Sequence, residues 1–357
     1  MSEEEIQAAV RVLRSGALRQ GPECEAFENE FAAVTGAKHA VTCANGSASL
    51  HLAYTAVLEP GDEVLVPSFT FFATASMVIQ SGMKPVICDV DPDTYLLDLS
   101  DAEKRLTPKT RGIAPVHLFG NACDVDQVRA FAQRHNLKII WDAAQAQGTL
   151  WNGADVGALG ETVCYSFYPT KNLFVGEGGM VTTPDPEIAH RMRFLRTHGQ
   201  TAKYTHTMIG WNYRMTDVEA AIGRAQLKRL PAMLAARRRN AKILTDGLKD
   251  MKGLKLQRIT TQTTHSWHQY CLVVDESSFG TSRDRLMEHL KQSGVATAVH
   301  YPRAVHQQPI IEQLYGMQKL TVSERLTSTI MALPVHHGLS EKDTHSIVQA
   351  FRSLTAK

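Results

Sequence analysis

The stretch Ser166-Phe167-Tyr168-Pro169-Thr170-Lys171, followed by Gly176-Glu177-Gly178-Gly179, is the most informative part of this chain. It begins at the end of an apolar segment, so Lys171 is expected in a loop that follows a buried strand. Most lysines lie at the surface and are chemically inert. Lys171 differs because the Ser166 hydroxyl is close to it in sequence and the glycines permit a tight backbone turn. The stretch therefore indicates a reactive amine beside a site for a polar ligand.

A carboxylate at the end of a second apolar segment belongs to the same argument. Asp142 closes the run 137–142 and is followed by Ala143-Ala144-Gln145-Ala146. This places Asp142 at the carboxyl end of a strand, where open α/β sheets bind ligands. Taken alone, Asp142 is explained equally well as a helix cap. Together with Lys171 it matches what pyridoxal phosphate chemistry requires: an amine for the aldehyde, and a carboxylate that keeps the ring nitrogen protonated.

A candidate phosphate site lies at Asn45-Gly46-Ser47-Ala48, directly before a predicted helix. The backbone N–H groups and the Ser47 hydroxyl at the positive end of that helix would converge on an anion. A Gly-Ser pair before a helix is more often a plain N-cap, so the motif is weak evidence when it stands alone. Its value comes from its combination with Lys171 and Asp142.

Short apolar runs alternate with helical patterns through the first part of the chain. This alternation predicts an α/β fold, with a mostly parallel sheet flanked by helices in a large domain. An amphipathic helix is expected first, because Ser2 and Glu5 form a capping-box pattern ahead of Ile6, Val10 and Leu13. The predicted strands are 63–67, 85–89, 112–116, 137–142, 162–167 and 180–183, and the other predicted helices are 48–58, 72–81, 124–136, 186–196 and 216–230.

The remainder of the chain predicts a smaller α+β domain. Pro231 and the basic run Arg237-Arg238-Arg239 mark the predicted transition. At 357 residues the chain is long enough for two domains. We divide it into a large domain, 1–235, and a small C-terminal domain, 236–357. The predicted elements of the small domain are strands at 270–274 and 296–299 and helices at 282–293 and 342–354.

Composition argues against several classes of function. Lys and Arg total 38 against 36 Asp and Glu, and the formal net charge of +2 gives no electrostatic reason to expect a nucleic-acid or membrane partner. The six cysteines are scattered without a CxxC pair, which is typical of reduced, buried thiols. The N-terminal residues lack a basic, apolar signal sequence, and no run of about 18 uncharged apolar residues occurs. We expect a cytoplasmic protein.

The 15 histidines raise the question of a metal site. None of the neighbouring histidines has a ligand spacing supported by nearby cysteine or carboxylate residues. We therefore expect no metal ion. The pairs considered are His265 with His268, His300 with His306, and His336 with His337.

Over nearly its whole length the chain resembles the sugar aminotransferases of the DegT/DnrJ/EryC1/StrS group, which have the type I, aspartate aminotransferase-like fold. The resemblance runs from about Ile6 to the C-terminal helix. It depends on eight segments in fixed order, which together are far more specific than any one of them. The segments are Asn45-Gly46-Ser47-Ala48, Pro67-Ser68-Phe69-Thr70-Phe71, Val116-His117-Leu118-Phe119-Gly120, Asp142-Ala143-Ala144-Gln145-Ala146, Ser166 through Lys171, Gly176-Glu177-Gly178-Gly179, Gly210-Trp211-Asn212-Tyr213-Arg214-Met215 and His300-Tyr301-Pro302.

The resemblance implies a role for each residue of the site. Lys171 would form the Schiff base with pyridoxal phosphate, Asp142 would pair with the pyridine nitrogen, and Gln145 would approach the ring hydroxyl. Phe71 corresponds to the aromatic residue that stacks on the cofactor ring, where a flat face fixes the tilt of the pyridinium. In isolation Phe71 would be assigned to the core. The residues implied in phosphate binding are Gly46, Ser47, Ala48 and Ser166.

The resemblance also places part of the site between subunits. Asn212 resembles the asparagine that reaches the phosphate of the neighbouring subunit's cofactor, so a homodimer is expected. His300, Tyr301 and His306 belong to a loop that relatives place near the mouth of the active site, where we expect substrate contacts. One departure is Trp141, which stands where relatives often have an acidic residue.

By the same resemblance, the expected reaction is a transamination in two stages through pyridoxamine phosphate. L-glutamate is the expected donor and a nucleotide-linked keto sugar the acceptor, preferably a 4-keto-6-deoxy hexose. Within the family, an aminocyclitol or aminobenzoate precursor is an alternative acceptor. A rival from another class is a regulatory protein that keeps the fold without turnover, and the presence of both Lys171 and Asp142 argues against it.

Overall fold

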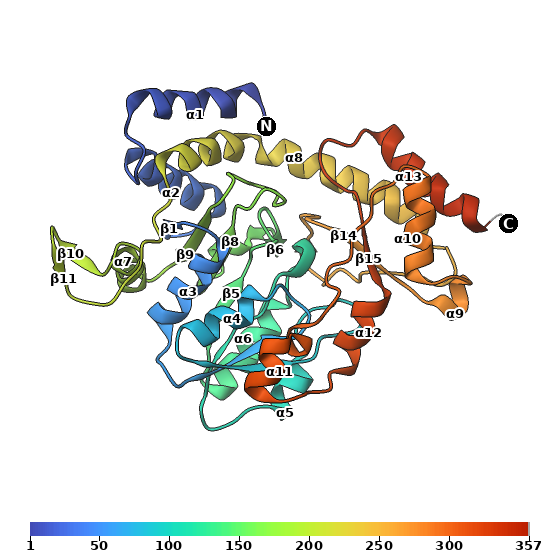
Figure 1. Ribbon diagram of the computed structural model, residues 1–357, viewed down its shortest axis with the longest axis horizontal. Helices are drawn as coiled ribbons and strands as arrows, with labels where there is room; N and C mark the ends of the chain where they lie inside the picture. The colour runs from blue at the N-terminus through green and yellow to red at the C-terminus, as the bar shows by residue number, and fades with distance from the viewer. Residues whose placement is uncertain (356–357) are drawn as a thin grey trace.

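The computed structural model describes residues 1–355 and is organised around a seven-stranded sheet (Figure 1). In spatial order the strands are β1 (His39–Cys43), β9 (Gly179–Thr183), β8 (Thr162–Ser166), β5 (Lys138–Asp142), β4 (Thr110–Ile113), β2 (Glu63–Pro67) and β3 (Lys84–Cys88). The strands from β8 to β3 are parallel, and β9 is antiparallel to both of its neighbours. The prediction of an α/β fold with a mostly parallel sheet is therefore confirmed.

Helices cover both faces of the sheet, because successive residues of a strand point to opposite sides. In β5, Ile139 and Trp141 belong to one apolar core and Ile140 to the other. Both faces are buried, which is why the parallel strands appear in the sequence as continuous apolar runs. The helices that contribute to the first core include α2 (Pro22–Thr35), α5 (Leu99–Lys104) and α6 (Val125–His135), and those that contribute to the second include α3 (Gly46–Val57), α4 (Ala73–Gln80) and α7 (Pro186–Leu195).

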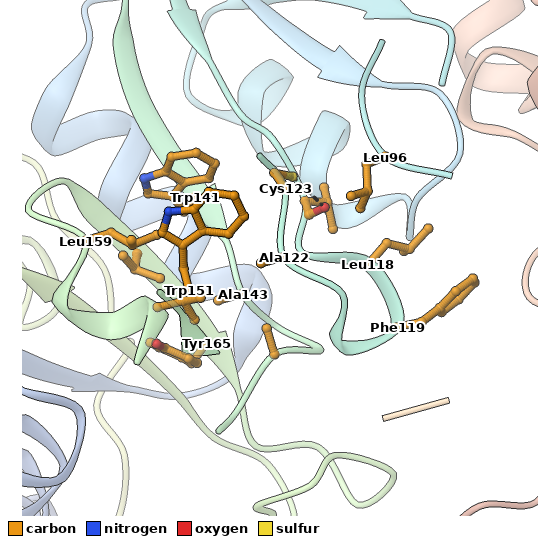
Figure 2. Packing of buried hydrophobic residues seen from close by; sticks show 14 of the residues in the cluster. Leu96, Leu118, Phe119, Ala122, Cys123, Trp141, Ala143, Trp151, Leu159 and Tyr165 are labelled. Carbon is orange, nitrogen blue, oxygen red and sulfur yellow. Dashed lines mark hydrogen bonds between the residues drawn. The ribbon is translucent and has the colours of Figure 1, made fainter. Parts of the chain in front are cut away.

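Figure 2 shows part of the first core around Trp141, which is fully buried. The indole Nε1 donates a hydrogen bond to Glu161 Oε2 at 3.1 Å. The ring stacks on His117, with the ring centroids 5.0 Å apart. Trp151 and Tyr165 lie in the same core. Trp141 is thus a packing residue, and its departure from the family pattern does not alter the strand end at which Asp142 lies.

Two small strand groups lie outside the central sheet. β6 (Leu150–Trp151) pairs with β7 (Ala154–Asp155) and also with β13 (Thr263–Thr264), which ties two distant parts of the chain together. β10 (Gln200–Ala202) and β11 (Thr205–His206) form a hairpin. The hairpin projects from the body at the left of the view in Figure 1.

The C-terminal part of the chain has an apolar core of its own, with buried residues from Ala241 to Phe351. A three-stranded sheet lies in it, with β14 (Tyr270–Val274) between β12 (Leu254–Leu256) and β15 (Ile330–Leu333). This core lies within 236–357, the range predicted for the small domain, while Leu326 and Ile311 of that range pack into the two cores of the central sheet. The helices in this part are α9 (Glu276–Phe279), α10 (Arg283–Gln292), α11 (Pro309–Tyr315), α12 (Thr321–Thr329) and α13 (Glu341–Thr355).

The predicted transition at Pro231 does not coincide with the end of a helix. α8 (Asp217–Leu248) continues through Pro231 and through Arg237-Arg238-Arg239. Proline removes a backbone donor and normally breaks a helix, but tertiary packing holds this one on both sides. The helix packs against α1 (Glu3–Ser15), α2 and α13, and Figure 1 shows it running from beside α1 and α2 across to α13.

Two further predictions had different outcomes. The first helix is confirmed as α1, with the capping box between Ser2 and Glu5. However, Ile6 and Leu13 are exposed, whereas Glu5 is fully buried and pairs with Arg229 of α8. The predicted strand at 296–299 is wrong, because the segment forms only a single bridge between Ala298 and Ala332.

The state of the cysteines and the character of the helices can be compared with the expectations from composition. All six cysteines are buried with free thiols. Within residues 1–355, none of the helices combines the length and the apolar character needed to cross a membrane.

Phe27 of α2 offers a test of how much the first core contributes to stability. Its ring is fully buried, lies 5.4 Å from the ring of Phe167 and rests against Gly223 of α8. We expect Phe27→Ala to lower the free energy of unfolding by about 3–5 kcal/mol, because a buried ring is replaced by a cavity. Urea unfolding followed by circular dichroism measures the change. Val34→Ala is the control, since Val34 lies on the same helix and is 58% exposed; equal losses in the two variants would contradict the assignment.

Candidate active site

A cavity of about 740 Å³ lies beside the carboxyl ends of β2, β5 and β8. Parallel strands bring their carboxyl ends to one edge of a sheet, so residues far apart in sequence meet there. Nine of the predicted site residues line the cavity: Gly46, Ser47, Phe71, Asp142, Gln145, Ser166, Lys171, His300 and Tyr301.

The N-terminus of α3 forms one end of the cavity. Asn45 caps this helix, because its Oδ1 accepts a hydrogen bond from Ala48 N at 2.8 Å and its carbonyl accepts one from Ser49 N at 3.0 Å. The N–H groups of Gly46 and Ser47 have no partner of this kind in the described chain, as expected for a first helical turn. These two donors and the positive end of the helix suit a phosphate group.

Close packing places Ser166 directly beside this helix end. A Cβ atom on Gly46 would lie 2.6 Å from Ser166 Cβ, so only glycine allows the two segments to approach. A Cβ atom on Gly179 would collide with the carbonyl oxygen of Asn45. The glycines of both motifs therefore act by letting the backbone segments touch, which brings the Ser166 hydroxyl to the same end of the cavity as α3.

Asp142 is almost completely buried at the end of β5. Its Oδ1 accepts a hydrogen bond from Ala144 N at 3.0 Å, and its Oδ2 accepts one from the Thr74 hydroxyl at 2.8 Å. Burial raises the pKa of Asp142, and the two hydrogen bonds and the charge of Lys171 act in the opposite direction. A carboxylate held in this way suits a positively charged ring nitrogen, whose charge would favour the ionised form.

Lys171 lies in the turn that follows β8, where its N–H donates to the carbonyl of Tyr168 at 2.9 Å. Burial lowers the pKa of its amine to about 8, although the charge of Asp142 opposes this shift. A lowered pKa makes an amine nucleophilic near neutral pH, because more of it is unprotonated. The structure therefore places a reactive amine and a buried carboxylate in one cavity.

Gln145 is held at both ends of its amide. Its Oε1 accepts a hydrogen bond from Phe119 N at 2.9 Å, and its Nε2 donates to the Tyr301 hydroxyl at 2.7 Å. The second hydrogen on Nε2 remains available for a ligand in the cavity. Phe71 lines the same cavity and contacts the Tyr301 ring at 6.3 Å between centroids. Phe71 is 59% exposed, so its outer face is open to a further group.

Three predicted site residues do not line the cavity. Ala48 follows the cavity-lining Ser47, but its N–H is already bonded to Asn45, which leaves it no donor for phosphate. Asn212 is exposed and forms a bridge with Thr197 away from the cavity. His306 is 1% exposed and bonds to Ser68 and Glu324, so the substrate contact expected for it is not supported.

The structure also adds residues that the sequence reasoning did not select. Each of these residues either lines the cavity or forms a hydrogen bond with a residue that lines it. Thr74 was missed because its bond to Asp142 joins residues 68 positions apart. His268 is buried, and burial followed by the charge of Lys171 keeps its pKa well below the usual value. The added residues are Thr74, His268 and Gln269, and the residues that belonged to quoted motifs without an assigned role are Asn45, Thr70, Tyr168, Thr170 and Glu177.

The residues present fit pyridoxal phosphate. A buried carboxylate, a reactive amine, an amide donor and unpaired backbone N–H groups are the partners that the ring nitrogen, aldehyde, ring hydroxyl and phosphate would need. No group of three His, Cys, Asp or Glu residues suited to a metal ion occurs in residues 1–355.

Comparisons with known proteins agree with this site. A sequence model of the DegT/DnrJ/EryC1/StrS aminotransferase family matches residues 1–352. A GDP-perosamine synthase from Caulobacter vibrioides is 39% identical over 334 residues, which is 91% of this chain and 88% of the relative. A pleiotropic regulatory protein from Geobacillus stearothermophilus is 38% identical over 343 residues, which is 95% of this chain and 91% of the relative.

Solved structures show the same arrangement of the chain. DesV of S. venezuelae, crystallised with a ketimine intermediate, superposes with a TM-score of 0.94 at 36% identity. The match covers 99% of this chain and 95% of DesV. This chain therefore belongs to the DegT/DnrJ/EryC1/StrS aminotransferase family, and it is a pyridoxal phosphate-dependent aminotransferase with the type I fold.

Proposed function

We propose that this enzyme moves the amino group of L-glutamate to a nucleotide-linked keto sugar, with a 4-keto-6-deoxy hexose as the preferred acceptor. The observation that carries the amine-transfer chemistry is the position of Lys171 in one cavity with the buried carboxylate of Asp142. Relatives are named as a GDP-perosamine synthase and as a UDP-linked glucosamine 3-aminotransferase. These names support a sugar acceptor over an aminocyclitol or aminobenzoate precursor.

Each residue of the cavity has a proposed role in this reaction. Bound pyridoxal phosphate supplies an electron sink for the carbon that carries the amine. The Asp142 carboxylate would keep a proton on the ring nitrogen, and Gln145 Nε2 would donate to the ring hydroxyl. Lys171 Nζ would hold the cofactor, and its amine would remove and return the proton at the reacting carbon.

The phosphate of the cofactor is proposed to bind at the N-terminus of α3. There the N–H groups of Gly46 and Ser47 and the Ser166 hydroxyl converge. Phe71 is proposed to cover the cofactor ring. His300 and Tyr301, on the loop that closes the cavity, are proposed to contact the substrate.

We also propose that the active form is a homodimer, with Asn212 reaching the cofactor phosphate of the neighbouring subunit. Several large apolar side chains are exposed, which is consistent with a surface that a partner covers. Tyr204 and Ile209, on and after the projecting hairpin, are 83% and 88% exposed, and Leu13 of α1 is 55% exposed. A cytoplasmic location remains part of this proposal. The regulatory alternative is not retained, because Lys171 and Asp142 both lie in the cavity.

Replacement of Lys171 tests the role of its amine. We expect Lys171→Ala to abolish amine transfer, with a loss of at least about a thousandfold in kcat, because no other amine in the cavity can replace it. Spectrophotometry of the purified variant with added cofactor should find no Schiff-base band near about 420 nm. Lys291→Ala is the matched control, since the Lys291 side chain is 78% exposed. Full activity in the Lys171 variant would contradict the mechanism.

The pKa of Lys171 predicts how the cofactor-free protein captures pyridoxal phosphate. Only the unprotonated amine attacks the aldehyde, so capture should be faster above the pKa than below it. With a pKa of about 8, the unprotonated fraction, and hence the rate, should rise about tenfold from pH 7 to pH 9 and then level off. Stopped-flow absorbance measures the rate. A rate that keeps rising past pH 10 would indicate an exposed, ordinary lysine instead.

The substrates are tested by separating the two stages of the reaction. We expect L-glutamate to convert the bound cofactor to its amine form, with a shift of the absorbance band to about 330 nm. Nucleotide-linked 4-keto and 3-keto sugars are then added one at a time. The correct acceptor restores the original band, and mass spectrometry identifies the amino sugar. Restoration by a cyclic ketone without a nucleotide, and by none of the sugars, would overturn the proposed acceptor.

A further inference from the structure

Three side chains from distant parts of the chain form a hydrogen-bonded series, which we call the Ser–His–Glu series: Ser68, His306 and Glu324. Ser68 and His306 are buried, and the Glu324 side chain is 33% exposed. His306 lies in a short 3-10 helix, η3 (Val305–Gln307), and is 1% exposed. Its Nδ1 is 2.5 Å from Ser68 Oγ, and its Nε2 is 3.2 Å from Glu324 Oε1. Both ring nitrogens are therefore used.

The chemistry of Glu324 fixes the direction of its bond with His306. The pKa of Glu324 is lowered, first by a hydrogen bond from Leu320 N and then by His306, so the carboxylate is ionised and can only accept. His306 Nε2 must then carry the hydrogen and donate to Glu324. The bond between Nδ1 and the Ser68 hydroxyl can run in either direction, because a hydroxyl both donates and accepts.

The series resembles a hydrolytic triad in its residues but not in its surroundings. A nucleophilic serine must reach a substrate. The Ser68 side chain is completely buried, and neither Ser68 nor His306 lines the active-site cavity. The series therefore holds parts of the structure together and does not attack a bound molecule.

The serine end of the series joins two walls of the cavity. Ser68 follows β2 and precedes Thr70 and Phe71, which line the cavity, while His306 ends the loop that carries Tyr301. Besides the bond to His306, the Ser68 carbonyl accepts one from Val305 N at 2.8 Å. Two hydrogen bonds therefore join the segment that carries Phe71 to the loop that carries Tyr301.

The glutamate end of the series is anchored to the large domain. Glu324 lies in the first turn of α12, and its Oε1 also accepts a bond from Leu320 N at 3.0 Å. Asp89, which follows β3, accepts bonds from Val322 N and Ser323 N, both at 2.9 Å. The imidazole of His306 is therefore held between two points that are fixed on the ends of neighbouring parallel strands.

The loop held in this way orients a residue of the cofactor site. Tyr301 packs against Phe69 and Phe71, with ring centroids 5.9 Å and 6.3 Å apart. Its hydroxyl accepts the hydrogen bond from Gln145 Nε2 at 2.7 Å. A shift of the loop would change the position of the Gln145 amide. It would also change the distance between the Phe71 and Tyr301 rings.

We propose that His306 is a positioning residue of this aminotransferase: through Ser68 and Glu324 it fixes the loop of Tyr301 and thereby sets how Gln145 and Phe71 meet the cofactor ring. The inference rests on the proposed function only in assigning Gln145 and Phe71 to the cofactor. His306 itself touches neither the cavity nor a substrate.

The test compares the holoenzyme with His306→Phe, which keeps a ring but removes both nitrogens, and with Ser68→Ala and Glu324→Gln, which each weaken one bond. We expect His306→Phe to weaken pyridoxal phosphate binding about tenfold and to slow the glutamate half-reaction at least as much. Visible circular dichroism of the bound cofactor should change in shape, because it reports the tilt of the ring. The two milder variants should show smaller changes in the same quantities, and they carry the test if His306→Phe does not fold.

Thr344→Val is the matched control. Thr344 is completely buried in α13, and its hydroxyl donates to the Ser340 carbonyl at 2.9 Å, far from the cavity. It should lower the melting temperature without altering cofactor affinity or dichroism. If the variants of the series behave like this control, the series is only structural and the proposal is overturned. Cofactor affinity and dichroism can be measured without turnover. If the wild-type enzyme binds the cofactor but does not react with L-glutamate, the proposed donor is refuted. The test of His306 still gives a clear answer in that case.

Discussion

Burial of a carboxylate and an amine at one edge of the central sheet is the constraint on which the active site depends. Asp142 and Lys171 follow neighbouring parallel strands, β5 and β8, and both lie where burial disfavours the charged form. A buried carboxylate is stable only when hydrogen bonds surround it. Thr74 and Ala144 provide these bonds, which fixes the packing of α4 and of the turn after β5 around the site.

The phosphate end of the cavity depends on a second constraint, the close approach of backbone segments. Gly46 and Gly179 have no side chains, which lets the N-terminus of α3 lie against Ser166 and lets β9 lie against Asn45. A helix end, a strand end and a serine hydroxyl can then face the same anion. The contact between the two glycine-containing motifs explains why they occur together in one chain, although more than 100 residues separate them.

Much of the fold and part of the site could be predicted from the sequence. The strands that end at Pro67, Asp142 and Ser166 were found because buried parallel strands leave continuous apolar runs. Lys171 and Asp142 were found because their chemistry is distinctive. The continuation of α8 through Pro231 was not found, because local propensity predicts a break and only packing on both sides of the helix overrides it.

The sequence by itself determined the fold class and the chemistry of the reacting groups, because hydrophobic periodicity and residue type are local properties of the chain. Only the tertiary structure decided which polar groups form hydrogen bonds with the reacting groups and with the residues around them. The bond from Thr74 to Asp142, the bond from Gln145 to Tyr301 and the burial of His306 each join residues that no spacing rule connects. Such pairings depend on the order of the strands in the sheet and on how the C-terminal part of the chain packs against the strand ends. Both arrangements result from many contacts between residues that are far apart in the sequence.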